Sequence, residues 1–293
     1  MNLVIFGLGY SATHFIQSRA EKFCCTATVT TTEKARSLTR PGLDVRVFSP
    51  ETIDPFIFDA IAKADAVLAS VGPGANGDPA LECFGAAMAQ APNLKTIVYL
   101  STIGVYGDHQ GAWIDETTPC APSNDRSRWR LRVEEQWLAL GAPAGRHVHV
   151  LRLAGIYGPG QNALVNLRRG TARRIVKPGQ VFNRIHVEDI ARAIDACLVD
   201  RGNGRIWNIS DNEPAPGEDV VTYAAKRLGM QPPPLIDFET ATLSPMARSF
   251  YGETKRVSNR AMREELGVKL AFPSYREGID ALFEDGDGSM TTA

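Results

Sequence analysis

The chain has 293 residues, enough for one large domain with a smaller appended part, and its hydrophobic content of 44% suits a globular core. The 32 basic and 33 acidic residues leave a formal net charge of -1, which excludes a global field that would attract nucleic acid or an anionic membrane. The five cysteines are odd in number and lack Cys-x-x-Cys spacing, so we expect neither a disulfide framework nor a metal site. No basic leader precedes the first apolar run, and no run reaches the roughly 18 residues of a membrane span, which favours the cytoplasm.

Apolar runs of strand length alternate with stretches of helical composition. The strand-like runs cover residues 3–6, 26–31, 45–48, 66–70, 96–100, 148–153 and 206–209, and the helix-like stretches cover residues 14–19, 80–90, 130–140, 189–199 and 220–228. This alternation predicts an α/β fold, in which βαβ units build a parallel sheet buried on both faces. After residue 153, clustered glycines and prolines predict a smaller lobe, and the composition of residues 285–293 predicts a disordered tail.

A glycine-rich turn follows the first predicted strand. It reads Gly7-Leu8-Gly9-Tyr10-Ser11-Ala12 and opens a helix-like stretch, which is the context of a dinucleotide-binding turn. Gly7 permits the tight turn, Gly9 lets a pyrophosphate approach the backbone, and Ala12 lets helix and strand pack closely. The alternative is an ordinary glycine-rich turn without a ligand.

The end of the second predicted strand should face the adenosine ribose, where an acid favours NAD. The chain has Thr30-Thr31-Thr32 there, followed by Glu33, while Lys34 and Arg36 can pair with a 2′-phosphate. We therefore favour NADP over NAD, with solvated charges as the alternative. The fourth strand ends in Ser70-Val71-Gly72, small residues that would let the cofactor cross the strand tips.

Several further motifs occur in a fixed order. They are residues 99–108 (YLSTIGVYGD), Glu116 and Pro119, residues 151–160 (LRLAGIYGPG), residues 183–191 (NRIHVEDIA), and residues 255–259 (KRVSN) followed by Leu266-Gly267. With the glycine-rich turn they resemble the extended short-chain dehydrogenase/reductases of the NAD-dependent epimerase/dehydratase type, over nearly the whole chain. The resemblance implies a Rossmann-type doubly wound parallel sheet formed by residues 1–153 and 184–210. Residues 154–183 and 211–284 would then form a small C-terminal substrate lobe.

The resemblance also implies where catalytic residues should lie. The family uses a Ser or Thr with a Tyr-x-x-x-Lys pair, in which the tyrosine exchanges a proton with the substrate. Thr102 falls at the Ser/Thr position, but Arg126 stands at the tyrosine position and Arg130 at the lysine position. Arginine stays protonated at physiological pH, so Arg126 cannot exchange that proton. Arg130 can instead contact the cofactor ribose, and Arg126 can clamp an anionic substrate group.

Other candidates for acid/base chemistry are Tyr106 and Tyr157, although both can be packed aromatics. His186 can titrate near neutral pH, but a packed histidine is the alternative that we favour. A local basic patch on the substrate side contains Arg168, Arg169, Arg173, Arg174 and Lys177. Because aromatic side chains are not interleaved with it, we do not expect this patch to bind nucleic acid.

The sequence thus favours an atypical NAD(P)-dependent oxidoreductase or epimerase acting on a small polar or nucleotide-linked substrate. The alternative is an NAD(P)-binding sensor or scaffold without turnover, which the missing tyrosine supports.

Overall fold

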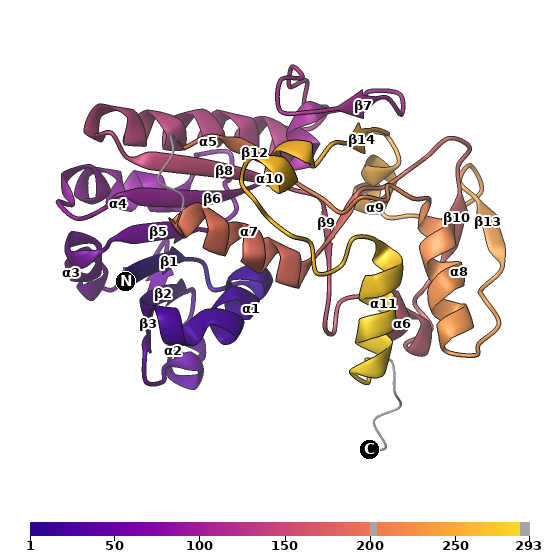
Figure 1. Cartoon of the computed structure of the whole chain (residues 1–293), viewed down its shortest axis with the longest axis horizontal. Helices are drawn as coiled ribbons and strands as arrows, with labels where there is room; N and C mark the ends of the chain where they lie inside the picture. Colours follow the sequence, from indigo (N-terminus) through magenta and orange to yellow (C-terminus); the bar gives the residue numbers. More distant parts are fainter. Residues whose placement is uncertain (200–203, 288–293) are drawn as a thin grey trace.

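A computed structural model describes residues 1–199 and 204–287, and its centre is an eight-stranded sheet (Figure 1). In sheet order the strands are β12 (Ile206–Ile209), β8 (His147–Leu153), β6 (Thr96–Thr102), β5 (Ala66–Ala69), β1 (Asn2–Phe6), β2 (Cys24–Val29), β3 (Leu43–Ser49) and β4 (Thr52–Ile53). All neighbouring strands pair in parallel except β4, which is antiparallel to β3. The order reverses between β1 and β5, so the carboxyl ends of these two strands flank a topological switch point, where ligands of such sheets bind.

Helices cover both faces of this sheet. One face carries α1 (Tyr10–Arg19), α2 (Thr32–Leu38) and α7 (Val187–Val199), and the other carries α3 (Phe56–Lys63), α4 (Pro79–Gln90) and α5 (Asp125–Gly141). Each face has its own apolar core, because alternate side chains of every strand point to opposite sides. Strands buried on both faces explain the continuous apolar runs of the sequence.

Most of the remaining elements form a smaller part beside the carboxyl ends of the strands (Figure 1). They are β9 (Gly155–Tyr157), α6 (Ala163–Arg168), β10 (Arg174–Val176), β11 (Arg184–His186), α8 (Gly217–Arg227), β13 (Leu235–Asp237), α9 (Pro245–Phe250), β14 (Arg256–Val257) and α11 (Tyr275–Glu284), together with β7 (Trp113–Ile114) from the loop after β6. Helix α10 (Arg260–Glu264) packs instead against β12, on the sheet face that carries α1, α2 and α7. Parallel pairs join β9 to β11, β10 to β13 and β7 to β14. A separate apolar core lies between α6, α8 and α11.

The predicted α/β fold with a parallel sheet is confirmed. The second strand differs in its bounds, because it ends at Val29 and the side chain of Thr31 instead accepts a hydrogen bond from the Lys34 backbone as the N-cap of α2. Asp287 lies beyond α11, and its carboxylate accepts a hydrogen bond from the Gly160 backbone at 2.8 Å. Of the predicted disordered tail, residues 285–287 are therefore described by the structure. Residues 288–293 lie outside the described residues.

None of the helices in residues 1–199 and 204–287 has the length and apolar character needed to cross a membrane.

Candidate functional site

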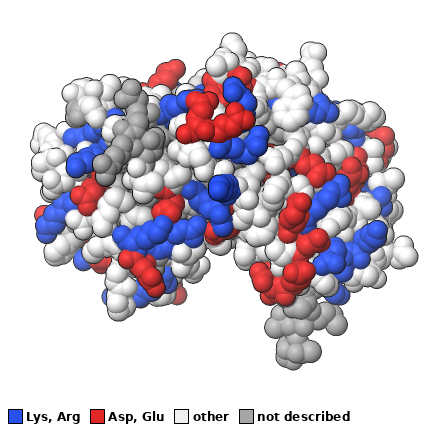
Figure 2. All heavy atoms as spheres, in the orientation of Figure 1, with Lys and Arg blue, Asp and Glu red and all other residues white. Residues whose placement is uncertain are grey.

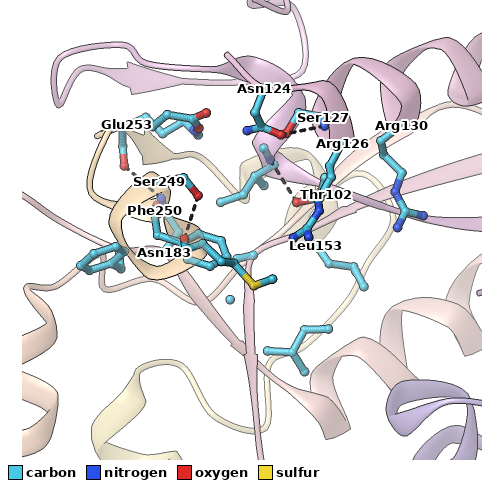
Figure 3. A pocket seen from close by; sticks show the side chains of 18 of the residues that line it. Thr102, Asn124, Arg126, Ser127, Arg130, Leu153, Asn183, Ser249, Phe250 and Glu253 are labelled. Carbon is cyan, nitrogen blue, oxygen red and sulfur yellow. Dashed lines mark hydrogen bonds and ion pairs between the residues drawn. The ribbon is translucent and has the colours of Figure 1, made fainter. Parts of the chain in front are cut away.

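A cavity of about 960 Å³ opens between the carboxyl ends of the sheet strands and the smaller part. Its walls come from the loop after β5, the ends of β6 and β8, the first turns of α5, strands β9 and β11, helix α9 and the segment before β14. Thr102, Arg126 and Arg130 all line it, so the structure brings together three of the four predicted catalytic residues. Figure 3 shows these side chains on one wall and those of Ser249, Phe250 and Glu253 opposite.

The glycine-rich turn lies at the carboxyl end of β1 and leads into α1. Gly7 has a φ of +86°, and a Cβ there would lie 2.9 Å from Cγ2 of Val71, so only glycine fits this position. A Cβ on Gly9 would meet no atom of the described residues within 4 Å. The open space beside Gly9 adjoins the first turn of α1, whose backbone N–H groups have no partners within the helix. The turn therefore offers room and hydrogen-bond donors for an anion.

The rest of the predicted turn is packed into the protein. Ala12 is fully buried, Leu8 is 4% exposed and Ser11 is 7% exposed. The hydroxyl of Tyr10 donates a hydrogen bond to the Pro159 carbonyl at 3.0 Å, and burial raises the pKa of Tyr10 to about 12. Tyr10 therefore joins α1 to the smaller part.

The predicted ribose contacts lie on the first turns of α2. Glu33, Lys34 and Arg36 are all exposed, and Arg36 lines a second, shallower cavity beside β3. Within the described residues none of the three side chains forms an ion pair, so both Lys34 and Arg36 are available to an external phosphate.

Arg130 is fixed at the tips of the neighbouring strands. Its Nη1 donates hydrogen bonds to the carbonyls of Leu100 at 2.9 Å and Val71 at 3.5 Å, and to the Tyr99 hydroxyl at 3.0 Å. The backbone of Ser70 in turn donates to the carbonyl of Phe6 at 2.9 Å. Arg130 and the small residues after β5 thus lie across the switch point from the glycine-rich turn. Gly72 completes this edge, and a Cβ there would lie 3.6 Å from Nη2 of Arg130.

Thr102 ends β6 at the cavity wall. Its Oγ1 accepts a hydrogen bond from the Gly104 backbone at 3.1 Å, which leaves the hydroxyl proton for a ligand. Ser127 lines the same wall from α5, and its backbone N–H donates to the N-cap Asn124 at 3.0 Å.

Arg126 occupies the first turn of α5 and lines the cavity. Its side chain is exposed, and it makes no hydrogen bond or ion pair with any residue in the described ranges. The neighbouring Arg128, in contrast, pairs with Asp125 at 2.6 Å.

Tyr106 is a packed aromatic that is not among the described residues lining the large cavity. Tyr106 is fully buried, its hydroxyl donates to Oδ1 of Asn208 at 2.8 Å, and its ring packs under the guanidinium of Arg152. Burial raises the pKa of Tyr106 to about 12, so it stays neutral at physiological pH.

Tyr157 lines the large cavity, but its hydroxyl already has a partner, and His186 is packed in the interior. The Tyr157 hydroxyl donates to the Ser274 carbonyl at 3.4 Å, and burial raises its pKa. His186 is 4% exposed, packs against Phe272, and has a pKa lowered to about 4 by burial, which confirms the packed histidine.

The basic patch mainly holds the smaller part together. Arg173, Arg174 and Lys177 donate to the carbonyls of Thr242, Pro233 and Tyr251. The five predicted patch residues lie in the smaller part, but none of them is among the described residues that line the large cavity. Positive and negative side chains are interspersed over the face of the molecule in Figure 2.

Three charged residues of the cavity, namely Arg184, Glu253 and Lys255, were not predicted as site residues. Lys255 is 5% exposed, and its Nζ donates to Oε2 of Glu253 at 2.7 Å and to the Gly107 carbonyl at 2.6 Å. The Ser123 hydroxyl donates to the other carboxylate oxygen of Glu253. Lys255 belongs to a C-terminal motif of the sequence, and no local pattern shows that this motif reaches the cavity. In the described residues, no group of three or more His, Cys, Asp and Glu side chains is arranged to hold a metal ion.

Comparisons with known proteins agree with this geometry. Residues 82–210 match the model of the NAD dependent epimerase/dehydratase family. Protein YeeZ of Escherichia coli is 30% identical over 284 residues, covering 92% of this chain and 96% of YeeZ. The chain belongs to the NAD-dependent epimerase/dehydratase family.

Two solved structures are similar to this chain over nearly its whole length. A functionally unknown conserved protein from Silicibacter pomeroyi is 42% identical, with a TM-score of 0.87 and coverage of 97% of this chain and 98% of that one. MoeE5 in complex with UDP-glucuronic acid and NAD is 21% identical, with a TM-score of 0.77 and the same coverage. Because the sequence identity to MoeE5 is 21%, this similarity supports the fold and no function.

Proposed function

We propose that the protein binds a nicotinamide dinucleotide, with NADP favoured over NAD, and acts as an atypical oxidoreductase or epimerase on a small polar or nucleotide-linked substrate. The observation that carries the proposal is the turn at Gly7 and Gly9, where one glycine is required by the backbone and the other leaves open space at the start of α1. MoeE5, a structural relative, binds UDP-glucuronic acid and NAD. A cytoplasmic location stays a prediction from the sequence.

The residues present fit such a cofactor. The first turn of α1 would receive the pyrophosphate, and the unused guanidinium nitrogens of Arg130 would donate to ribose hydroxyls. When bound, the nicotinamide ring would supply or accept a hydride. Thr102 would donate its hydroxyl proton in a hydrogen bond to a substrate oxygen, and the cavity walls would exclude water from the reacting carbon.

A second candidate function is dinucleotide binding without turnover. It is favoured by Arg126, because a guanidinium at the position of the family's tyrosine cannot exchange a proton at neutral pH. This candidate requires the same cofactor contacts and differs only in the absence of a reaction.

Calorimetric titration with NADPH and NADH tests the cofactor proposal. NADPH should bind at least as tightly as NADH, and Lys34→Ala with Arg36→Ala should weaken NADPH selectively, because both cations are available beside the N-terminus of α2. Arg40→Ala, beyond the other end of α2, is the matched control and should change neither affinity. A clear preference for NADH, together with an NADPH affinity that the double substitution does not change, would indicate instead that Glu33 binds the adenosine ribose.

A further inference from the structure

The charges around the large cavity are unbalanced. Among the described residues, those that line it include four cations and one carboxylate, namely Arg126, Arg130, Arg184, Lys255 and Glu253. Glu253 is already paired with Lys255 at 2.7 Å, so no carboxylate of the wall neutralises the three arginines. Unscreened positive charge in a concave site raises the local concentration of anions.

Arg130 and Arg184 are held by neutral acceptors. Arg130 donates to backbone carbonyls and a hydroxyl, and Nη1 of Arg184 donates to the carbonyls of Phe182 at 2.9 Å and Ala215 at 3.0 Å. These bonds fix the two side chains. The buried carboxyls of Asp78 and Asp211 do not line the cavity but interact with the charges of Arg130 and Arg184, respectively, which reduces what these two arginines contribute to the positive field of the cavity.

Arg126 differs because its whole guanidinium is available. It has no partner in the described part of the chain, and it extends from the first turn of α5 on the same wall as Thr102 (Figure 3). The planar fork of an arginine matches the two oxygens of a carboxylate or a phosphate ester. An arginine left without a counter-ion beside a hydroxyl that can orient a substrate oxygen is suited to an anionic ligand.

We infer that the substrate carries an oxyanionic group, a carboxylate or a phosphate ester, close to its reacting carbon, and that Arg126 binds this group. The inference rests on the proposed function for the identity of the reacting carbon, but the anion site itself does not require the cofactor. Arg126 thereby replaces a proton-exchanging residue of the family by a specificity-determining one. Neutral substrates would leave the cavity charge unpaired and should bind poorly.

Calorimetric titration with malonate, inorganic phosphate and the neutral analogue malonamide tests the site. Malonate or phosphate should bind the wild-type protein and malonamide should not. Arg126→Ala should weaken anion binding about tenfold or more, because a charge-assisted bidentate contact is lost. Arg126→Lys should retain part of the affinity, because lysine keeps the positive charge but cannot make the bidentate contact of a guanidinium.

Arg128→Ala is the matched control, because Arg128 lies on the same helix, is paired with Asp125 and does not line the cavity. It should leave the anion affinity unchanged. Tighter binding of malonate than phosphate identifies a carboxylate substrate, and the reverse identifies a phosphate ester. The inference is overturned if neither anion binds the wild-type protein, or if Arg126→Ala and Arg128→Ala have equal effects. A parallel NADPH titration separates the two proposals, because Arg126→Ala should leave NADPH affinity intact, and absence of NADPH binding would contradict only the cofactor.

Discussion

At the scale of single residues, the glycine-rich turn is built from neighbours in the sequence, whereas the role of Tyr106 is decided by a contact with a distant residue. The turn from Gly7 to Ala12 could be predicted because its strand, glycines and helix are contiguous. Tyr106 could not be resolved in this way, because its hydroxyl partner Asn208 is 102 residues away. The sequence resemblance predicts Arg126 at the position of the family's tyrosine, but only the structure shows that Arg126 has no hydrogen-bond or ion-pair partner among the described residues.

Gly9 gives the sharpest test at this scale. Gly9→Val should abolish NADPH binding without unfolding the protein, because the added side chain enters space that no described residue occupies. Thermal melting with and without NADPH measures both effects. Gly7→Val is the contrasting variant, and it should lower the melting temperature without cofactor because it forces a β-branched residue to positive φ against Val71. Cofactor stabilisation that persists in Gly9→Val would mean that the turn is only structural.

At the scale of elements, the position of α5 controls the site, because this helix carries both Arg126 and Arg130. Two buried contacts hold it against the sheet. Arg130 binds the tips of β5 and β6, and one turn further on Glu134 accepts hydrogen bonds from Arg152 of β8, at 2.7 Å from Nη2, and from the Ser101 hydroxyl. The sequence predicted the later turns of α5 but not its start at Asp125, since the alternating arginines of the first turns show no apolar stripe.

The buried pair makes a quantitative prediction. Glu134→Gln should lower the free energy of unfolding by about 3–5 kcal/mol, because it leaves the Arg152 charge buried without compensation. Urea-induced unfolding provides the measurement. Asp125→Ala, which breaks the exposed pair with Arg128, is the control and should cost less than about 1 kcal/mol. The double variant Glu134→Leu with Arg152→Met should recover much of the loss, and a loss as large as that of the single variant would argue against the ion pair as the cause.

At the scale of the whole molecule, two parts of the chain meet through buried polar groups that were not predicted. Asp211 lies just after β12 and is 2% exposed, and its backbone donates to the carbonyl of Arg184 in β11 at 2.7 Å. Burial raises the pKa of Asp211 to about 7, and nearby Arg184 opposes this shift only partly. Since such contacts join residues distant in sequence, the arrangement of the smaller part could not be derived from local patterns.

Asp211 should make stability depend on pH. A carboxyl whose pKa is higher in the folded state than in the unfolded state binds more protons when the protein is folded. Its contribution to the free energy of unfolding is therefore present at low pH and is lost as the pH rises toward 7. From about pH 5 to about pH 8, the wild-type free energy of unfolding should therefore fall relative to that of Asp211→Asn. Chemical denaturation at several pH values measures the difference. Asp59→Asn, an exposed change on α3, should run parallel to wild type, and a parallel profile for Asp211→Asn would contradict the assignment.

The order of strands in the sheet also bears on how the protein is made. β8 ends at Leu153, but its outer neighbour β12 starts only at Ile206, and the intervening chain builds β9, α6, β10, β11 and α7 before it returns. Parallel strands need a long crossover connection, and such long-range pairings slow folding. During synthesis, the edge of β8 therefore stays uncovered until residues beyond 209 have left the ribosome. A nascent chain that stalls within this interval exposes a ready template for intermolecular strand pairing, so chaperone binding should concentrate there.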